Sequence, residues 1–318
     1  MIILIVAAAI AVLILSVGAY LFHRACVRTP DLPWLDPDAI LKTSYAPYAD
    51  LIQKSHRWLK EHNAEDVWVQ SGDGLKLHGL WVPAENPIGT IVLIHGYHST
   101  NLVDFGGSMA FFHGQGLNLL LPDQRSHGKS EGKYITFGVR ESGDMIRWLQ
   151  FLETLWQGPV LLSGLSMGAS TVMFMADEPL PENVKGLLVD CGFSAPADII
   201  GKVFRDVTHL PPIPWIWGAE LFARVMAGFS LWEKSSIKSL QKNTRPILMV
   251  HGKADDFVPW EMTQRAYHAC DGDKKVLFVD GAGHGVSFLV DRQRYMEAVS
   301  EILRKTLGVA YELRANQE

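Results

Sequence analysis

The sequence has few cysteines and no cluster of positive charge. Its three cysteines, Cys26, Cys191 and Cys270, are an odd number without Cys-x-x-Cys spacing, which favours neither a disulfide framework nor a zinc site. The formal net charge is −5 and no basic tract occurs, so the charge pattern of a nucleic-acid-binding protein is missing. No group of His, Cys, Asp or Glu has zinc-ligand spacing. We therefore expect no nucleic-acid partner, no metal and no cofactor.

Charged side chains are also missing from residues 1–22. This run is almost all Ile, Leu, Val and Ala, and it is about as long as a helix that crosses the hydrocarbon layer of a bilayer. A cleaved signal peptide is the alternative, but no Lys or Arg precedes the run and it is longer than a signal-peptide core. Because Arg24, Arg28 and Lys42 follow the run, the positive-inside rule predicts a single-pass membrane protein with its large C-terminal part in the cytoplasm.

The rest of the chain has the composition of a folded domain. Hydrophobic residues make up 48% and charged residues 20% of the 318 residues, which excludes general disorder and fits one large domain with appendages. Residues 23–63 are expected to form a linker and a short helix, since apolar residues recur at helical offsets in residues 51–61. The folded domain is expected to begin near that helix.

Short apolar runs of strand length recur through residues 64–193 and 243–318. An antiparallel hairpin is expected at residues 66–83, around a Ser-Gly-Asp-Gly turn. Further strands are expected at residues 90–94, 117–121, 160–162, 184–189, 247–250 and 276–279, with helical segments such as 142–155 and 169–176 between them. Strands that alternate with helices predict a doubly wound α/β core with a mainly parallel sheet.

One interval, residues 194–242, interrupts this alternation. It contains several prolines and many aromatic residues and is too long for a simple crossover. We expect a mostly helical cap over the carboxyl edge of the sheet, where open α/β sheets bind ligands. Its apolar residues are expected mainly to pack against the core domain, and as a set they favour an apolar acyl or aromatic substrate group. They are Phe204, Trp215, Trp217, Leu221, Phe222, Val225, Met226, Phe229 and Trp232.

A Gly-Leu-Ser-Met-Gly segment at residues 164–168 follows one predicted strand and opens a helical segment. This is the context of a nucleophile elbow, in which glycines allow a sharp turn that exposes the serine. A serine hydroxyl needs a base to remove its proton and a carboxylate to orient that base. His284 and Asp255 each follow a predicted parallel strand, so they are expected at the same sheet edge as Ser166, in the chain order Ser, Asp, His.

These segments resemble those of the α/β-hydrolases, within the group of single-domain esterases, monoacylglycerol lipases and prolyl-oligopeptidase-like peptidases. The resemblance covers about residues 66–307 and includes Ile-His-Gly-Tyr at 94–97, Asp-Gln-Arg-Ser-His-Gly-Lys-Ser at 123–130 and His-Gly-Lys-Ala-Asp-Asp-Phe-Val-Pro at 251–259. One departure is Ser126, where the family usually has glycine. The resemblance implies an eight-stranded, mostly parallel sheet, with Asp255 rather than its neighbour Asp256 as the triad acid. It also implies an oxyanion hole made by the backbone N–H groups of Tyr97 and Met167.

Four other histidines have structural interpretations beside functional ones. His95 and His251 each end a strand before a glycine and are expected to brace loops, because a catalytic role requires reach to Ser166. His98 and His127 either border the pocket or make structural hydrogen bonds, and the second interpretation is favoured.

The sequence thus predicts a serine hydrolase that cleaves carboxylic esters through an acyl-serine intermediate. The expected substrate is a small ester with an apolar, lipid-like group. A peptidase or amidase with the same triad is the close alternative. A catalytically silent, membrane-tethered binding module is a weaker one, because the chain retains the serine, the histidine and the oxyanion turn.

Overall fold

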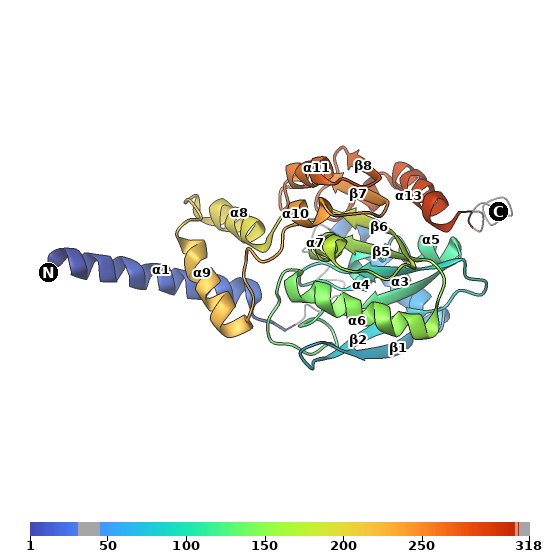
Figure 1. Ribbon diagram of the computed structural model, residues 1–318. Coiled ribbons are helices and arrows are strands. Elements are labelled where there is room, and N and C mark those ends of the chain that lie inside the picture. The colour runs from blue at the N-terminus through green and yellow to red at the C-terminus, as the bar shows by residue number, and fades with distance from the viewer. Residues whose placement is uncertain (31–44, 309–310, 312–318) are drawn as a thin grey trace.

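The computed structural model describes residues 1–30, 45–308 and 311. An eight-stranded sheet with the order β1-β2-β4-β3-β5-β6-β7-β8 forms its centre (Figure 1). The strands are β1 Glu65–Gln70, β2 Lys76–Val82, β3 Gly89–Ile94, β4 Leu117–Pro122, β5 Val160–Leu165, β6 Val184–Asp190, β7 Ile247–Gly252 and β8 Lys274–Val279. β2 pairs antiparallel with β1 and β4, and the pairs from β4 to β8 are parallel. The predicted hairpin and the mostly parallel sheet are therefore confirmed.

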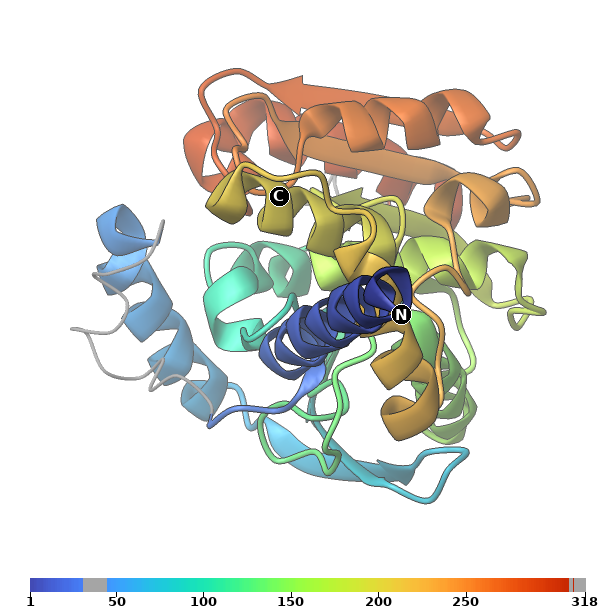
Figure 2. The same cartoon turned by 90° about the vertical axis from the view of Figure 1, so that its left-hand side faces the viewer.

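Helices cover both faces of the sheet (Figure 2). Along β3 the side chains alternate: Ile91 and Leu93 belong to one buried cluster, Val92 and Ile94 to another. The first cluster includes residues of α3, α5 and α13, and the second includes residues of α6, α7 and α11. The helices of the core are α3 Ala49–Glu61, α4 Asn101–Asp104, α5 Met109–Gly114, α6 Val139–Leu155, α7 Met167–Phe174, α11 Trp260–Ala269, α12 Ser287–Val290 and α13 Arg292–Leu307, with 3₁₀ turns η1 Ala46–Tyr48 and η2 Met175–Asp177.

The interval between β6 and β7 forms a largely helical cap, as predicted. It consists of α8 Pro196–Thr208, α9 Trp215–Phe222, a π-helical turn η3 Ala223–Ala227 and α10 Ser236–Leu240. Phe204 and Phe229 are buried, as expected of core packing. That expectation is wrong for five other apolar cap residues, which lie on α9, on η3 and in the turn that follows η3; α9 itself packs against the N-terminal helix. These exposed residues are Trp217, Leu221, Val225, Met226 and Trp232.

The N-terminal helix α1, Ile2–Cys26, is long enough and apolar enough to cross a membrane. Its first half stands clear of the domain, and its second half packs along the cap (Figures 1 and 2). Gly18, Phe22 and Cys26 are buried at four-residue spacing. At the crossing with α9, a Cβ atom on Gly18 would lie 2.3 Å from the carbonyl carbon of Gly218, so the two backbones meet where both helices have glycine.

The connection between this helix and the domain differs from the expected linker at residues 23–63. The helix continues to Cys26, Val27 forms an antiparallel bridge with Tyr134, and Arg28 N–H donates a 2.9 Å hydrogen bond to the Lys133 carbonyl. The chain therefore joins the folded domain at residues 22–28 rather than near residue 51. Residues 31–44 of the predicted linker lie outside the described residues.

Candidate active site

Ser166 lies in the turn between β5 and α7, with a backbone φ of 55° and ψ of −115°. This conformation is rare for a residue with a side chain, so the surrounding contacts must hold it. A Cβ atom on Gly164 would lie 2.2 Å from the carbonyl carbon of Gly168, and one on Gly168 would lie 1.9 Å from the carbonyl oxygen of Ile94. Both glycines are therefore needed for the close backbone approach that presents Ser166 at the sheet edge.

A chain of two hydrogen bonds connects Ser166, His284 and Asp255. The Ser166 hydroxyl lies 2.9 Å from His284 Nε2, and His284 Nδ1 lies 2.7 Å from Asp255 Oδ2. The three residues come from the loops after β5, β7 and β8, whose parallel alignment places these loops at one edge. The sequence-predicted residues are thus brought together in hydrogen-bonding order.

Both oxygens of the Asp255 carboxylate have hydrogen-bond donors. Its Oδ1 accepts the backbone N–H groups of Phe257 and Val258 at 3.0 and 2.8 Å, and its Oδ2 also lies 3.1 Å from His251 Nε2. Burial raises the pKa of Asp255, but hydrogen bonds from His251 and His284 outweigh burial and hold that pKa well below its ordinary range. Asp255 is therefore ionised at neutral pH and orients the His284 ring with Nδ1 protonated.

Two backbone N–H groups, those of Met167 and Tyr97, are predicted to form an oxyanion hole. Met167 N–H opens α7, and Tyr97 N–H follows the His-Gly turn after β3. Within the described residues, neither N–H donates a hydrogen bond to another protein group. Free N–H groups next to a nucleophile are suited to stabilise negative charge on a carbonyl oxygen.

A half-buried carboxylate, that of Asp104, holds this turn in place. It accepts the Gly96 N–H at 2.6 Å through Oδ2, and the hydroxyls of Ser99 at 2.6 Å and Tyr45 at 3.1 Å through Oδ1. Burial raises the pKa of Asp104, while the hydrogen bonds from Ser99 and Gly96 oppose that rise. Sequence reasoning missed Asp104, because an aspartate in a short helix outside any motif gives no signal of a bond to a turn eight residues earlier.

His95, His251 and His127 brace loops, as the sequence favoured. His95 lies 2.8 Å from the Gly96 carbonyl oxygen and 3.0 Å from the Gln124 backbone nitrogen, and His251 lies 2.6 Å from the Thr263 hydroxyl. His127 Nε2 accepts the His98 backbone N–H at 3.0 Å, directly after the Gly96–Tyr97 turn. Burial and the neighbouring His95 lower the pKa of His127 well below its ordinary range, which keeps the ring neutral and able to accept that bond.

A cavity of about 590 Å³ opens beside Ser166 and is lined mainly by apolar side chains. The core contributes Tyr97, Phe137, Ser166, Phe193 and Phe257, and the cap contributes Ile199, Ile200, Val203, Phe204, Val207, Thr208, Leu210 and Trp215. The N-terminal helix contributes Val17, Tyr20, Leu21, Arg24 and Ala25, which the sequence did not predict. This volume is within the range of cavities that hold small-molecule ligands.

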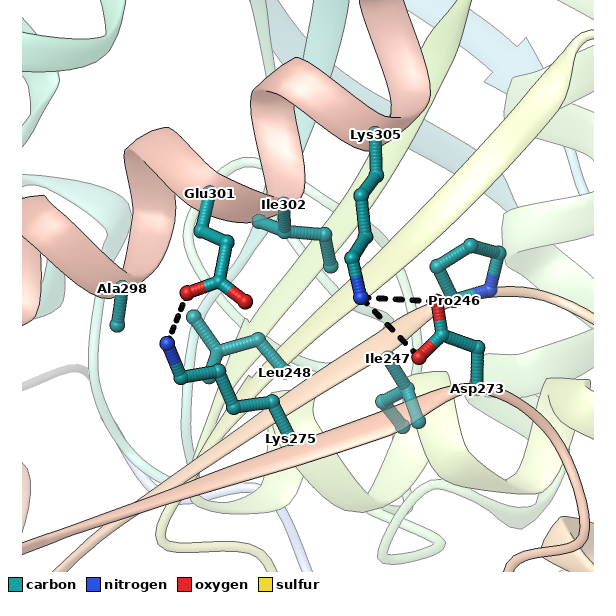
Figure 3. Close-up of a pocket in the computed structure, with 9 residues that line it drawn as sticks. All are labelled: Pro246, Ile247, Leu248, Asp273, Lys275, Ala298, Glu301, Ile302 and Lys305. Atoms are coloured by element: carbon teal, nitrogen blue, oxygen red, sulfur yellow. Dashed lines mark hydrogen bonds and ion pairs between the residues drawn. The ribbon is translucent and has the colours of Figure 1, made fainter.

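A second hollow, between β7, β8 and α13, is a poor candidate for a substrate site (Figure 3). It encloses only about 10 Å³, and ion pairs between Lys275 and Glu301 and between Lys305 and Asp273 lie along it. It has room for about one water molecule. The cavity that contains Ser166 is the candidate active site, because it opens onto the hydrogen-bond chain.

One group of potential metal ligands occurs in the described part of the chain: Cys191, Asp255 and His284, whose ligand atoms lie within 4.8 Å of one another. Both ring nitrogens of His284 already lie within hydrogen-bond distance of Asp255 and Ser166. Burial raises the pKa of the Cys191 thiol well above its ordinary value, which disfavours the thiolate form that binds metals. We assign these residues to the hydrogen-bond chain and its surroundings.

Comparison with known proteins places this arrangement in a family. A model of the alpha/beta hydrolase family matches residues 91–299. The uncharacterized protein YqkD of Bacillus subtilis is 28% identical over 237 residues, which cover 74% of this chain and 77% of YqkD.

Solved structures share the fold. The Pyrococcus furiosus esterase Pf2001 superposes with a TM-score of 0.65 at 21% identity, covering 84% of this chain and 96% of the esterase. The Pyrococcus horikoshii acylaminoacyl peptidase gives a TM-score of 0.58 at 16% identity, covering 80% of this chain and 43% of the peptidase. The family match spans most of the sheet and every residue of the hydrogen-bond chain, so this protein belongs to the alpha/beta hydrolase family.

Proposed function

We propose that the protein hydrolyses carboxylic esters with Ser166 as the nucleophile. The observation that carries this proposal is the Ser166–His284–Asp255 hydrogen-bond chain at the base of an apolar cavity. Family membership supports hydrolase activity in general, and the geometry of these residues supports the serine mechanism.

In this mechanism His284 accepts the Ser166 proton as the serine oxygen attacks the ester carbonyl carbon. The charge on the carbonyl oxygen is stabilised by the N–H groups of Tyr97 and Met167. The C–O bond to the leaving alcohol breaks as His284 returns the proton to it, which leaves an acyl-Ser166 intermediate. Water, deprotonated by His284, then attacks the acyl carbon. The bond from the acyl carbon to Ser166 breaks as His284 returns the proton to the serine oxygen, and the acid is released. Asp255 keeps His284 in the required tautomer and stabilises its charged form.

The cavity favours an apolar acyl group. Side chains such as Phe193, Ile200 and Phe204 line it, and its polar lining residues are few. Burial of an acyl chain against such a surface is favourable by about 25 cal/mol per Å² of apolar area. We infer that esters with a medium or long chain are better substrates than acetate.

We further propose that α1 anchors the protein in a membrane, with the catalytic domain on the cytoplasmic side. Arg24, Arg28 and Lys42 on the C-terminal side of the apolar run support this orientation. Val17, Tyr20 and Leu21 line the cavity, so cleavage of the segment as a signal sequence would remove part of the cavity wall. This favours an anchor over a signal sequence.

The test is hydrolysis of p-nitrophenyl esters from acetate to palmitate by the full-length protein, beside Ser166→Ala and the matched p-nitroanilides. We expect the wild-type protein to hydrolyse the esters and to prefer those with longer chains. We expect Ser166→Ala to hydrolyse neither the esters nor the anilides. Anilide hydrolysis at rates equal to ester hydrolysis would replace the proposal with an amidase. Ester turnover that persists in Ser166→Ala would refute it.

A further inference from the structure

We propose that the cap is embedded in one leaflet of the membrane and that the cavity takes the acyl chain of its substrate directly from that leaflet. This inference rests on the proposed ester hydrolase function and on α1 as the anchor, and it identifies the substrate class as esters whose acyl chain resides in the bilayer. Four structural features carry it.

The first feature is the length of α1 that stands free. Residues 2–13 of α1 are exposed on all sides, whereas Ile14, Gly18 and Phe22 pack towards the cap. A helix rises 1.5 Å per residue, so the free part covers only about 20 Å of a hydrocarbon layer that is about 30 Å thick. The packed residues up to Phe22 are needed to complete the crossing. The part of α9 that lies beside them must therefore share the depth of the leaflet.

The second feature is an exposed apolar stripe on the cap. Trp217, Leu221 and Val225 recur at every fourth position along α9 and η3 and are exposed by 60, 47 and 75%. In water such exposed apolar side chains are unfavourable, whereas hydrocarbon solvates them well. The neighbouring Arg224 is paired with Glu220, so the charge beside the stripe is neutralised.

The third feature is the position of the cavity mouth. Ser166 and Phe193 at the base are almost fully buried, whereas Tyr20 on α1 and Val207 on α8 are exposed by 64 and 76%. Val17 and Tyr20 belong to the apolar run that crosses the bilayer. The cavity thus extends along α1 from Ala25, near the site, towards the membrane-spanning part of the helix.

The fourth feature is the tie between the helix and the oxyanion turn. The Tyr97 hydroxyl donates to the carbonyl oxygen of Ala25 at 2.9 Å. The ring of Tyr97 also stacks on Phe137 with a centroid distance of 5.1 Å. The site therefore holds a fixed place relative to α1, so an acyl chain that enters along α1 arrives beside Ser166.

The location of the cap is tested with a fluorescent probe in the full-length protein. The native cysteines are buried, so a thiol-reactive, environment-sensitive dye labels an introduced cysteine selectively. Leu221→Cys on the stripe is compared with Leu155→Cys at the end of α6, because the two leucines are exposed by 47 and 44%. Val225→Cys serves as a second stripe position.

The labelled proteins are placed in phosphatidylcholine nanodiscs that contain a lipid with a nitroxide on its acyl chain. We expect blue-shifted emission and strong quenching at Leu221→Cys and Val225→Cys, and water-like emission without quenching at Leu155→Cys. Water-like emission at both stripe positions would overturn the proposal. This readout does not depend on catalysis, so it stands apart from any failure of the proposed function.

The route of the acyl chain is tested with two esters. Leu221→Asp places a charge on the stripe, and Leu155→Asp is the matched control. Leu221→Asp is expected to lower hydrolysis of p-nitrophenyl palmitate in phosphatidylcholine vesicles by about tenfold and to leave hydrolysis of soluble p-nitrophenyl acetate unchanged. Equal rates for Leu221→Asp and wild type with both esters would overturn the leaflet route. Absence of turnover of both esters by the wild-type protein would reject the proposed function.

Discussion

The side-chain hydroxyl of Tyr97 donates a 2.9 Å hydrogen bond to the backbone carbonyl of Ala25, near the C-terminal end of α1. Burial raises the pKa of Tyr97 well above its ordinary value, so the hydroxyl remains a donor at every working pH. The same residue supplies a proposed oxyanion donor through its backbone N–H. The N-terminal helix is thereby connected through one side chain to the turn beside Ser166.

Tyr97→Phe removes this bond and retains the ring. We expect kcat for ester hydrolysis to fall severalfold, because the lost bond contributes about 1 kcal/mol to the position of the turn. Steady-state kinetics with p-nitrophenyl butyrate measures the effect, with Tyr267→Phe on α11 as the control. A wild-type kcat in Tyr97→Phe would show that the bond has no bearing on the turn.

Gly18→Leu forces α1 away from α9, because no side chain fits between Gly18 and Gly218. We expect a loss of about 1–3 kcal/mol in the free energy of unfolding and a larger relative loss of activity on palmitate than on acetate esters. Thermal unfolding in detergent and the two kinetic assays measure these changes. Ala11→Leu, on the free part of α1, is expected to behave like wild type. If both variants keep wild-type stability, the helix crossing is incorrect.

Asp104→Asn tests the brace of the oxyanion turn. An amide has one acceptor oxygen, so it cannot serve both Gly96 N–H and the two hydroxyls that Asp104 accepts. We expect kcat to fall about 10- to 100-fold with little change in KM, since the turn acts on the transition state. Asp50→Asn, on the exposed side of α3, is the control. A change confined to KM would contradict the assigned role.

Asp190→Asn tests a buried carboxyl at the end of β6, next to the site. Burial raises the pKa of Asp190 from 3.8 to about 6 against the opposing charge of His251. The folded state thus prefers the protonated form, so this contribution to stability is fully present below about pH 4 and is lost as the pH rises through about 6. Relative to wild type, the variant should gain up to about 3 kcal/mol in the free energy of unfolding between pH 4 and pH 7.

Urea unfolding of Asp190→Asn and wild type at pH 4, 5.5 and 7 measures this difference. Other titrating groups are common to both proteins and cancel when the two are subtracted. A difference that stays constant with pH would contradict the raised pKa.

Much of the site could be predicted because its residues belong to short sequence motifs. Strand-ending segments fixed the positions of Ser166, Asp255 and His284, and parallel strands bring their C-terminal ends to one edge. The exposure of apolar side chains on the cap could not be predicted, because hydropathy does not distinguish an apolar residue in a protein core from one on the surface. Trp217 and Leu221 were expected to pack inwards for that reason.

The second half of α1 shows a further limit of the sequence. Gly18 and Gly218 lie far apart in the chain, and a single glycine in an apolar run gives no information about its partner. The contribution of Val17 and Leu21 to the cavity follows from that contact and became visible only in three dimensions.

The central claim is that Ser166 is the nucleophile. Its most direct test is to treat the full-length protein with a fluorophosphonate and locate the adduct by peptide mass spectrometry. We expect modification of Ser166, none in Ser166→Ala, and wild-type labelling in the control Ser300→Ala. Ester hydrolysis is expected to fall by about 10⁴-fold or more in Ser166→Ala. An adduct on another serine, or ester turnover unchanged by Ser166→Ala, would contradict the account.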